Sequence, residues 1–237
     1  MKKLQDLEQI EQYYHRYKME RLFTLNYLNE FELIKVNRLE YICFQEELME
    51  YLYFLVEGRA KVFKSLANGK TLLISFYEPF EVIGDVELIR EMSAVCTVQA
   101  LETCYLLALP IEKFRMSLQK DIKLLNFVCN ALAEKLDHIS HNSSINLLYP
   151  LENRLANYID MTAVRLEKSD RGRCFNENLT QLAELLGISY RHLLRTLNGL
   201  CQGQILTRQK EGYIIINEVE LKKLVEGIYK YNICPLI

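Results

Sequence analysis

The sequence predicts an α+β fold with an N-terminal jelly-roll β barrel, a long helix and a C-terminal winged helix-turn-helix. Short β-rich runs separated by turn signals occupy residues 31–109, and an apolar stripe with helical spacing follows them. Two short helical patterns joined by Gly187 then precede a pair of strand-like runs. We therefore expect three parts, at residues 1–110, 111–147 and 148–237.

The N-terminal part begins with helical spacing and continues as strands. Apolar residues recur with helical spacing between residues 4 and 29, which predicts one or two amphipathic helices. The later runs YLYFLVEG, RAKVFKS, TLLISFY, CTVQALE and YLLALP are rich in β-branched and aromatic residues. Asn68 and Gly69 form a hairpin signal between two of these runs. Strands of this length and spacing are typical of a sandwich or a jelly-roll barrel.

Composition excludes several classes of protein. Half of the 237 residues are apolar or aromatic, so the chain can bury a core. No run approaches the ~18 consecutive apolar residues of a membrane helix, and the charged start MKKLQDLEQ lacks the apolar region of a secretory signal. The seven cysteines include no CxxC pair, which argues against a disulfide framework or a zinc ribbon. We expect a cytoplasmic protein with no membrane partner.

An apolar stripe with 4-3-4-3 spacing marks the predicted long helix. Its members are Leu125, Cys129, Leu132, Leu136 and Ile139. A helix of about thirty residues with so regular a stripe is too long to be covered by a small β barrel alone. A second copy of the helix would cover it, which predicts a symmetric homodimer through residues 111–147. The alternative interpretation is an ordinary core stripe within one chain.

The helix-turn-helix prediction rests on local signals that agree with one another. Asn178, followed three residues later by Gln181, is a capping box at the start of a helix. Gly187 suits the positive φ angle at the end of that helix, and Ser189 can cap a second helix two residues later. Two short helices joined by a tight glycine turn make a helix-turn-helix.

The second of these helices has an apolar face and a polar face. The apolar face comprises Leu193, Leu197 and Leu200. The polar face comprises Arg191, Arg195, Asn198 and Gln202. Arginine and asparagine can read guanine and adenine edges in a major groove. ILTRQKEGYIIIN follows as two strands around Glu211 and Gly212, a wing that carries Arg208 and Lys210.

The charge distribution supports the same surface, although it permits another interpretation. Residues 185–210 contain four basic residues and no acidic ones, within a chain of formal net charge −2. A short basic stretch in a nearly neutral protein indicates one defined contact surface for nucleic acid. The alternative is a helical hairpin whose polar face is simply solvated.

From about residue 30 to 217 the chain resembles a known family. The matching segments are FLVEGRAKVF, the Asn68-Gly69 turn, Ile83-Gly84-Asp85, Asn153-Arg154-Leu155-Ala156 and LAELLGISYRHLLRTLNGL. They are similar to the Crp/Fnr family of bacterial transcription regulators. That resemblance implies a cyclic-nucleotide-binding-like β roll, a dimerisation helix and a DNA-binding winged helix. It also implies double-stranded DNA and RNA polymerase as partners.

The resemblance assigns roles to residues of the recognition helix. Tyr190, Arg191 and Arg195 fall where family members contact bases, and Ser189 and His192 fall where they meet phosphate. Arg195 matches the arginine of the cyclic-AMP-responsive members. Tyr190 replaces an arginine and Arg191 a glutamate, so the preferred DNA site is expected to differ from theirs.

The effector pocket that the resemblance implies contains Gly84, Asp85, Glu87 and Ser93. Asp85 stands where cyclic-nucleotide binders have a glutamate for the ribose. The position of their phosphate-binding arginine holds Met92 in one alignment register and Ala94 in the other. Neither supplies the guanidinium that a phosphate requires. We therefore expect no cyclic AMP, and the identity of the effector stays open.

Other cofactors are also disfavoured. The oxygen-sensing branch of the family has a cysteine cluster in its N-terminal segment, but residues 1–42 contain no cysteine, which argues against an iron-sulfur cluster. No histidine falls within the β-rich region, which argues against haem. His138 and His141 are spaced i, i+3 on the long helix and could chelate a metal, but a solvent-facing pair is the simpler interpretation, so no metal site is assigned.

Two competing functions stay open. The first is a ligand-sensing module whose winged helix binds a protein; loss of the basic residues from the recognition helix would favour it, and they are present. The second is an enzyme, but no nucleophile elbow, phosphate-binding glycine loop or zinc-protease helix occurs. No catalytic residue is assigned.

Overall fold

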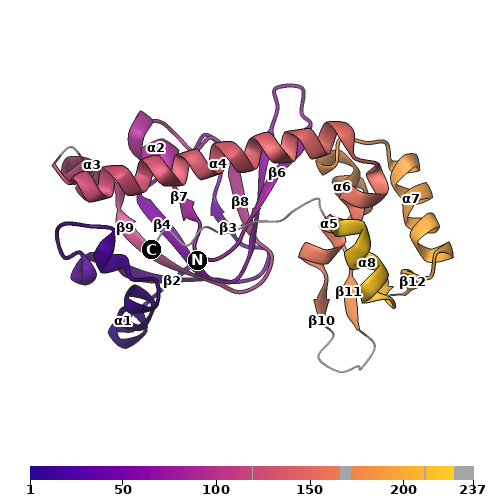
Figure 1. Cartoon of the computed structure of the whole chain (residues 1–237), viewed down its shortest axis with the longest axis horizontal. Coiled ribbons are helices and arrows are strands. Elements are labelled where there is room, and N and C mark those ends of the chain that lie inside the picture. The colour runs from indigo at the N-terminus through magenta and orange to yellow at the C-terminus, as the bar shows by residue number, and fades with distance from the viewer. Residues whose placement is uncertain (119, 166–171, 211, 227–237) are drawn as a thin grey trace. The chain divides into compact units, whose positions relative to one another are not determined.

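The computed structural model describes residues 1–118, 120–165, 172–210 and 212–226 (Figure 1). These residues fall into two compact units. The first contains residues 1–65 and 73–140, and the second contains residues 66–72 and the described residues from 141 onward. Each unit has its own sheets and its own core.

The first unit is built on a β roll of two antiparallel sheets. Within the described residues one sheet has the order β1-β2-β9-β4-β7 and the other β3-β8-β5-β6. The strands are β1 (Lys2–Leu4), β2 (Glu32–Val36), β3 (Tyr41–Cys43), β4 (Tyr51–Glu57), β5 (Ala60–Ser65), β6 (Thr71–Tyr77), β7 (Val82–Ile83), β8 (Thr97–Ala100) and β9 (Cys104–Pro110). The strand-rich region that the sequence predicts is thus observed, and Gly69 has the positive φ of +77° that its turn requires.

The alternation of side chains along the central strands explains why they are apolar throughout. In β4, Leu52, Phe54 and Val56 point to one core and Tyr53 and Leu55 to another. Successive side chains of a strand point to opposite faces. The first core lies between the five-stranded sheet and the helices, and the second lies inside the roll between the two sheets. Both faces of this sheet are therefore buried.

The N-terminal segment is less helical than its spacing predicts. Lys2–Leu4 pairs with β2 as an edge strand, α1 spans Leu7–Arg16, and two 3₁₀ turns follow at Met19–Arg21 and Leu28–Glu30. Its buried aromatic residues join the core on the outer face of the sheet. The prediction of one or two helices is therefore correct only for α1. The strand at residues 2–4 depends on a distant partner that local spacing does not report.

Two helices occupy the region for which one long helix was expected. The first, α3, spans Ile111–Leu118, and α4 spans Ile122–Leu148. Asp121 begins α4, because its Oδ1 accepts hydrogen bonds from the amides of Lys123 and Leu124. The same carboxylate accepts bonds from the amide and the hydroxyl of Thr24, which anchors this helix start to the N-terminal segment. Figure 1 shows α4 running past the strands of the roll.

The second unit is a small α+β domain. Its helices are α5 (Leu151–Thr162), α6 (Leu179–Leu185), α7 (Tyr190–Gln202) and α8 (Glu218–Val225). Its strands are β10 (Val164–Arg165), β11 (Arg173–Phe175), β12 (Leu206–Gln209) and β13 (Gly212–Ile215), in the order β10-β11-β13-β12. The turn residue Glu211 lies outside the described residues. None of the helices in the described ranges combines the length and the apolar character that crossing a lipid bilayer requires.

Candidate functional site

The predicted helix-turn-helix is present at α6 and α7. The side chain of Asn178 caps α6 by accepting hydrogen bonds from the amides of Thr180 (2.9 Å) and Gln181 (3.2 Å). Gly187 ends the turn after α6 with a φ of +68°, a conformation that side chains with a Cβ rarely adopt. The hydroxyl of Ser189 then caps α7 by accepting a bond from the amide of His192. Asn178, Gly187 and Ser189 thus perform the structural roles that the sequence predicts for them.

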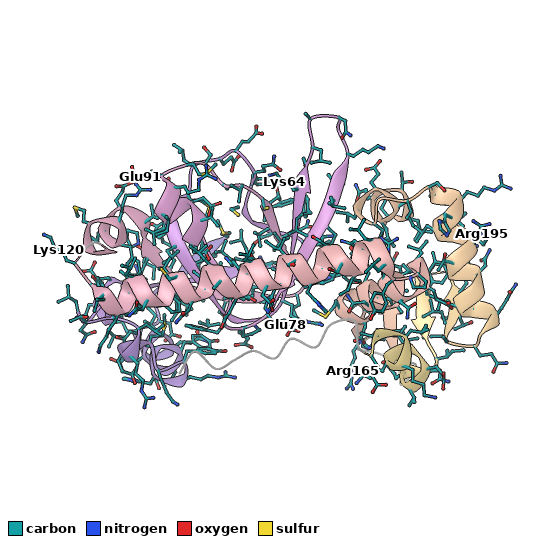
Figure 2. All side chains as sticks on the ribbon, turned by 45° about the horizontal axis from the view of Figure 1, so that its top comes forward. Lys64, Glu78, Glu91, Lys120, Arg165 and Arg195 are labelled. Carbon is teal, nitrogen blue, oxygen red and sulfur yellow. The ribbon has the colours of Figure 1, made fainter. Side chains whose placement is uncertain are left out.

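The polar face of α7 is held outward by a fully buried apolar face. Leu193, Leu197 and Leu200 each have no measurable exposure. The predicted DNA contacts on this helix and at its cap are all exposed, namely Ser189, Tyr190, Arg191, His192, Arg195 and Asn198. Figure 2 shows the Arg195 side chain on the solvent side of α7. The helix therefore presents a continuous row of hydrogen-bonding groups to a partner.

The wing carries the remaining two predicted contacts. Arg208, in β12, pairs across the ladder with Tyr213 of β13, and both Arg208 and Lys210 are exposed. A two-stranded wing next to a recognition helix suits backbone phosphates rather than base edges.

An ion-pair cluster fixes the scaffold behind these elements. The Arg173 guanidinium on β11 lies 2.5 Å from a carboxylate oxygen of Asp160 on α5 and 2.5 Å from one of Glu218 on α8. Hydrogen bonding to Arg173 lowers the pKa of Glu218. Three elements are thus joined by one side chain.

A second candidate site is a cavity of about 260 Å³ in the β roll. Its apolar lining comes from both sheets and from α4, namely Met49, Val62, Ile74, Ile83, Val86, Val95, Val98, Leu132, Leu136 and Ile139. Its other lining residues are Cys43, Tyr77, Gly84, Asp85, Glu87, Cys96 and Lys135. The helix α2 (Asp85–Arg90) begins at its edge. Burial raises the pKa of the Cys43 thiol to about 12, so this sulfur is protonated at neutral pH.

A buried ion pair dominates the polar part of this cavity. Lys135 Nζ on α4 lies 2.6 Å from Asp85 Oδ1 and donates another 2.6 Å hydrogen bond to the carbonyl of Val82. The Lys135 side chain is 13% exposed and that of Asp85 is 2% exposed. The ammonium also lies 5.2 Å from the centre of the Tyr77 ring. The second carboxylate oxygen, Asp85 Oδ2, is buried without a hydrogen-bond partner.

The protonation of this cluster follows from its burial and its charges. Burial by itself lowers the pKa of the Lys135 ammonium, but Tyr77, Asp85 and Glu81 together raise it above its ordinary value. Lys135 is therefore charged. Burial raises the pKa of the neighbouring Glu81 to about 7, although Lys135 opposes the shift. His138 Nδ1 lies 3.9 Å from a carboxylate oxygen of Glu81.

The structure brings together three of the four pocket residues expected from the sequence. Gly84, Asp85 and Glu87 line the cavity, and Ser93 does not. Ala94, the next residue, is held to the β3–β4 loop by backbone bonds at Glu46 and Glu47, so after α2 the chain returns to the cavity only at Val95. Glu87 Oε1 accepts a hydrogen bond from the Val95 amide. No arginine belongs to the described lining of this cavity.

Lys135 is the residue that sequence reasoning missed. It lies within the apolar stripe, three residues after Leu132 and one before Leu136. A cation so close to the apolar side of a helix could have indicated a buried acidic partner. Its particular partner, Asp85, is 50 positions away and could not be read from spacing.

The α4 helix has apolar residues on two sides. Leu124, Phe127, Val128 and Ala131 are buried, and the first three belong to the core that packs on the five-stranded sheet. The predicted dimerisation residues Leu125, Leu136 and Ile139 are 40%, 70% and 45% exposed, and Cys129 is exposed as well. Leu132 is partly buried against the core. Most of the stripe is thus uncovered within one chain.

Comparison with known proteins places this architecture in a family. Residues 33–121 match the family described as cyclic nucleotide-binding domain. Regulatory protein YeiL of Escherichia coli O157:H7 is 36% identical over 185 residues, which cover 78% of this chain and 81% of that protein. The chain is a Crp/Fnr-type transcription regulator.

More distant members of the Crp/Fnr family have the same fold. The cyclic AMP receptor protein of Thermus thermophilus is 24% identical over 180 residues, 76% of this chain and 81% of that protein. The crystal structure of a CRP-family transcriptional regulator from the same organism superposes with a TM-score of 0.63, covering 81% of this chain and 96% of that one at 18% identity. The predicted fold class is confirmed, and the relatives are regulators rather than enzymes.

Proposed function

We propose that this Crp/Fnr regulator binds an inverted-repeat DNA site as a homodimer, with α7 of each copy in a major groove. The observation that carries the proposal is the outward row of Arg191, Arg195 and Asn198, fixed by a leucine face with no measurable exposure. A rigid helix that offers guanidinium and amide groups has the chemistry of direct base readout. Arg208 and Lys210 in the wing supply positive charge for phosphate.

The exposed side of α4 supports the homodimer. Leu125, Cys129, Leu136 and Ile139 would be covered by the same residues of a second copy around a twofold axis. In such a dimer the two recognition helices enter successive major grooves, so half-sites are expected about 34 Å apart.

The β-roll cavity supports regulation without a cyclic nucleotide. A cyclic phosphate needs a guanidinium or another free cation, and the described lining offers no arginine. Lys135 is the cation there, and Asp85 and the Val82 carbonyl already hold it. Arg90, at the end of α2, is exposed and does not line the cavity. The regulator would act in the cytoplasm and contact RNA polymerase, as the family resemblance implies.

Selection of bound fragments from random double-stranded DNA tests the proposal. We expect enrichment of an inverted repeat whose half-sites are about one helical turn apart. The Arg195→Ala variant, selected in parallel, should lose preference at one base position in each half-site. Failure to enrich any sequence with the unaltered chain would contradict the proposal.

Calorimetry tests whether regulation is independent of cyclic nucleotides. Cyclic AMP and cyclic GMP should give no heat of binding, and low-micromolar affinity for either nucleotide would contradict that independence.

A further inference from the structure

The outer face of the four-stranded sheet carries an exposed pair of aromatic rings. β3 is an edge strand of that sheet, next to β8. Ile42 points into the core between the two sheets, so Tyr41 points outward. Its ring lies against that of Phe44, with the ring centroids 4.3 Å apart, and the two residues are 37% and 43% exposed. Large apolar side chains that are exposed together indicate a contact surface, whereas single ones do not.

Hydrogen bonds hold the chain around these rings in one conformation. Leu39, which is 52% exposed, has a φ of +69°, an uncommon conformation for leucine. Its amide donates to the carbonyl of Ala100, and its carbonyl accepts from the side chain of Gln99. The side chain of Gln45 exchanges two hydrogen bonds with the backbone of Ser65. A surface that is already ordered loses little conformational entropy when a partner binds.

The charges beside the rings are acidic. Glu46 and Glu47 follow in a turn that is closed by the bond from the Glu47 amide to the Phe44 carbonyl. Both glutamates are exposed, and no cation pairs with either of them among the residues that the structure describes. Residues 38–47 contain three glutamates and one arginine, a formal charge of −2. Lys61, on the same face of the sheet, is only 7% exposed and gives a partner little positive surface.

These features determine the chemistry of a partner. Carboxylates repel the phosphates of nucleic acid and attract arginine and lysine. The rings provide an apolar surface on which an aliphatic side chain can pack. Protein interfaces are rich in tyrosine and phenylalanine, and complementary charge across them steers association and selects partners. A protein segment that contains both basic and aliphatic residues matches the rings and the carboxylates together.

We propose that Tyr41 and Phe44, together with Glu46 and Glu47, form a docking surface for a basic, apolar segment of a second protein. An aliphatic side chain of the segment packs on the rings, and its arginine or lysine side chains pair with the two carboxylates. The surface belongs to the first unit, whereas the helix-turn-helix belongs to the second. The proposal therefore goes beyond the proposed function and does not depend on it.

Three capped peptides of equal length test the proposal on the full chain. One alternates leucine with arginine, the second serine with arginine, and the third leucine with glutamate. The amide resonance of Phe44, one of ten phenylalanines, reports binding after assignment with Phe44→Tyr. We expect the leucine–arginine peptide to shift it in a saturable way, the serine–arginine peptide to bind about tenfold more weakly, and the leucine–glutamate peptide to leave it unchanged. Equal affinity for the two basic peptides, a shift with the acidic peptide, or no shift with the first peptide would overturn the proposal.

A charge-matched pair of variants links binding to the two carboxylates. Glu46→Gln combined with Glu47→Gln should weaken binding of the labelled leucine–arginine peptide about tenfold and make it less dependent on salt, as measured by fluorescence anisotropy. Glu8→Gln combined with Glu11→Gln removes the same charge from exposed positions of α1. This control should bind the peptide as the unaltered chain does. Unchanged affinity in the first variant, or an equal loss in the control, would contradict the proposal.

Removal of the rings tests the apolar part of the surface. Tyr41→Ser combined with Phe44→Ser should lose peptide binding and keep the oligomeric state of the unaltered chain in sedimentation equilibrium. A changed oligomeric state would assign the surface to an interface between copies of this chain and would overturn the proposal. A shift of the Phe44 resonance by single-stranded oligothymidylate would assign the surface to nucleic acid and would overturn it as well. The three peptides and the carboxylate variants decide independently if the ring variant does not fold.

DNA binding measured on the same samples separates this proposal from the proposed function. Sequence-selective DNA binding without a response of Phe44 to the leucine–arginine peptide would refute the docking surface alone. A response to that peptide without sequence-selective DNA binding would refute the proposed function alone.

Discussion

Lys135 brings a full positive charge into the β roll, and Asp85 is the carboxylate that pairs with it directly. Its ammonium bonds to Asp85 Oδ1 and to the Val82 carbonyl, each at 2.6 Å. Lys135→Met would leave the Asp85 carboxylate buried without a counter-charge. We expect the free energy of unfolding to fall by about 3–5 kcal/mol, as for other broken buried pairs. Urea denaturation at neutral pH measures the change.

The double variant is the control for this prediction. Asp85→Asn together with Lys135→Met replaces the pair with uncharged side chains of similar size, and most of the lost stability should return. A double variant as unstable as Lys135→Met would mean that packing rather than charge is responsible. Double-mutant coupling between the two positions gives the interaction directly.

The buried carboxyl of Glu81 should make the stability of the protein depend on pH. Burial raises its pKa from the ordinary 4.5 to about 7 in the folded protein, so between these values the folded state binds more protons than the unfolded state. Glu81 therefore makes the protein less stable as the pH rises from about 5 through 7. Glu81→Gln should raise the free energy of unfolding by roughly 1–2 kcal/mol at pH 8, after allowance for partial solvent exposure, and change it little at pH 5.

Denaturation of wild type and Glu81→Gln at both pH values measures this effect. Glu11→Gln, at an exposed position of α1 that does not act on Glu81, is the control and should keep the wild-type pH dependence of stability. Equal stabilisation by Glu81→Gln at pH 5 and pH 8 would show that burial of the charge is not the cause.

At the scale of elements, the proposed function predicts that α7 and its wing make two kinds of contact with DNA, which differ in salt dependence. Arg195 lies on the exposed face of α7, where a guanidinium can read a guanine edge. Arg195→Ala should cost about 1–3 kcal/mol per half-site and relax preference at one base position. Lys210→Ala should weaken all sequences alike and reduce the salt slope by about 1, because one fewer counterion is released.

Fluorescence anisotropy with a selected and a scrambled duplex across a salt series separates these classes. Lys222→Ala, an exposed cation on α8, serves as the control and should bind as wild type does. If Arg195→Ala kept both affinity and sequence preference, α7 would not be the helix that reads DNA.

Some elements could be predicted from neighbouring residues in the sequence, and others depend on partners far away in the chain. Asn178, Gly187 and Ser189 act within a few residues of their own positions, so the helix-turn-helix could be predicted from the sequence, and the structure contains it. The edge strand at residues 2–4 and the Lys135–Asp85 pair depend on partners about 30 and 50 positions away. Periodicity reports which face of an element is apolar. It does not report which distant polar group that face will meet.

At the scale of the whole molecule, α4 has three roles. Its buried side completes the core of the first unit, Lys135 and Leu132 line the cavity, and Leu125 and Cys129 lie exposed one helical turn apart. A molecule bound in the cavity and a second copy of the chain would thus contact one rigid element. Coupling between the two requires only that the bound molecule favours one position of α4 over another.

The dimer predicted from α4 is tested best at residues that line neither the cavity nor the core. Leu125 and Cys129 meet that condition, whereas Leu136 lines the cavity and Leu132 packs on the core. Leu125→Glu combined with Cys129→Glu should give a monomer in sedimentation equilibrium, because paired carboxylates would face each other across the twofold axis. The control is Leu48→Glu, which changes an 83% exposed leucine in the β3–β4 loop and should leave the protein a dimer.

The monomeric variant should also bind the full inverted repeat no more tightly than a single half-site, because the second half-site adds affinity only when the two recognition helices are linked. A wild-type chain that is monomeric at micromolar concentration, or a double variant that stays dimeric, would place the interface elsewhere.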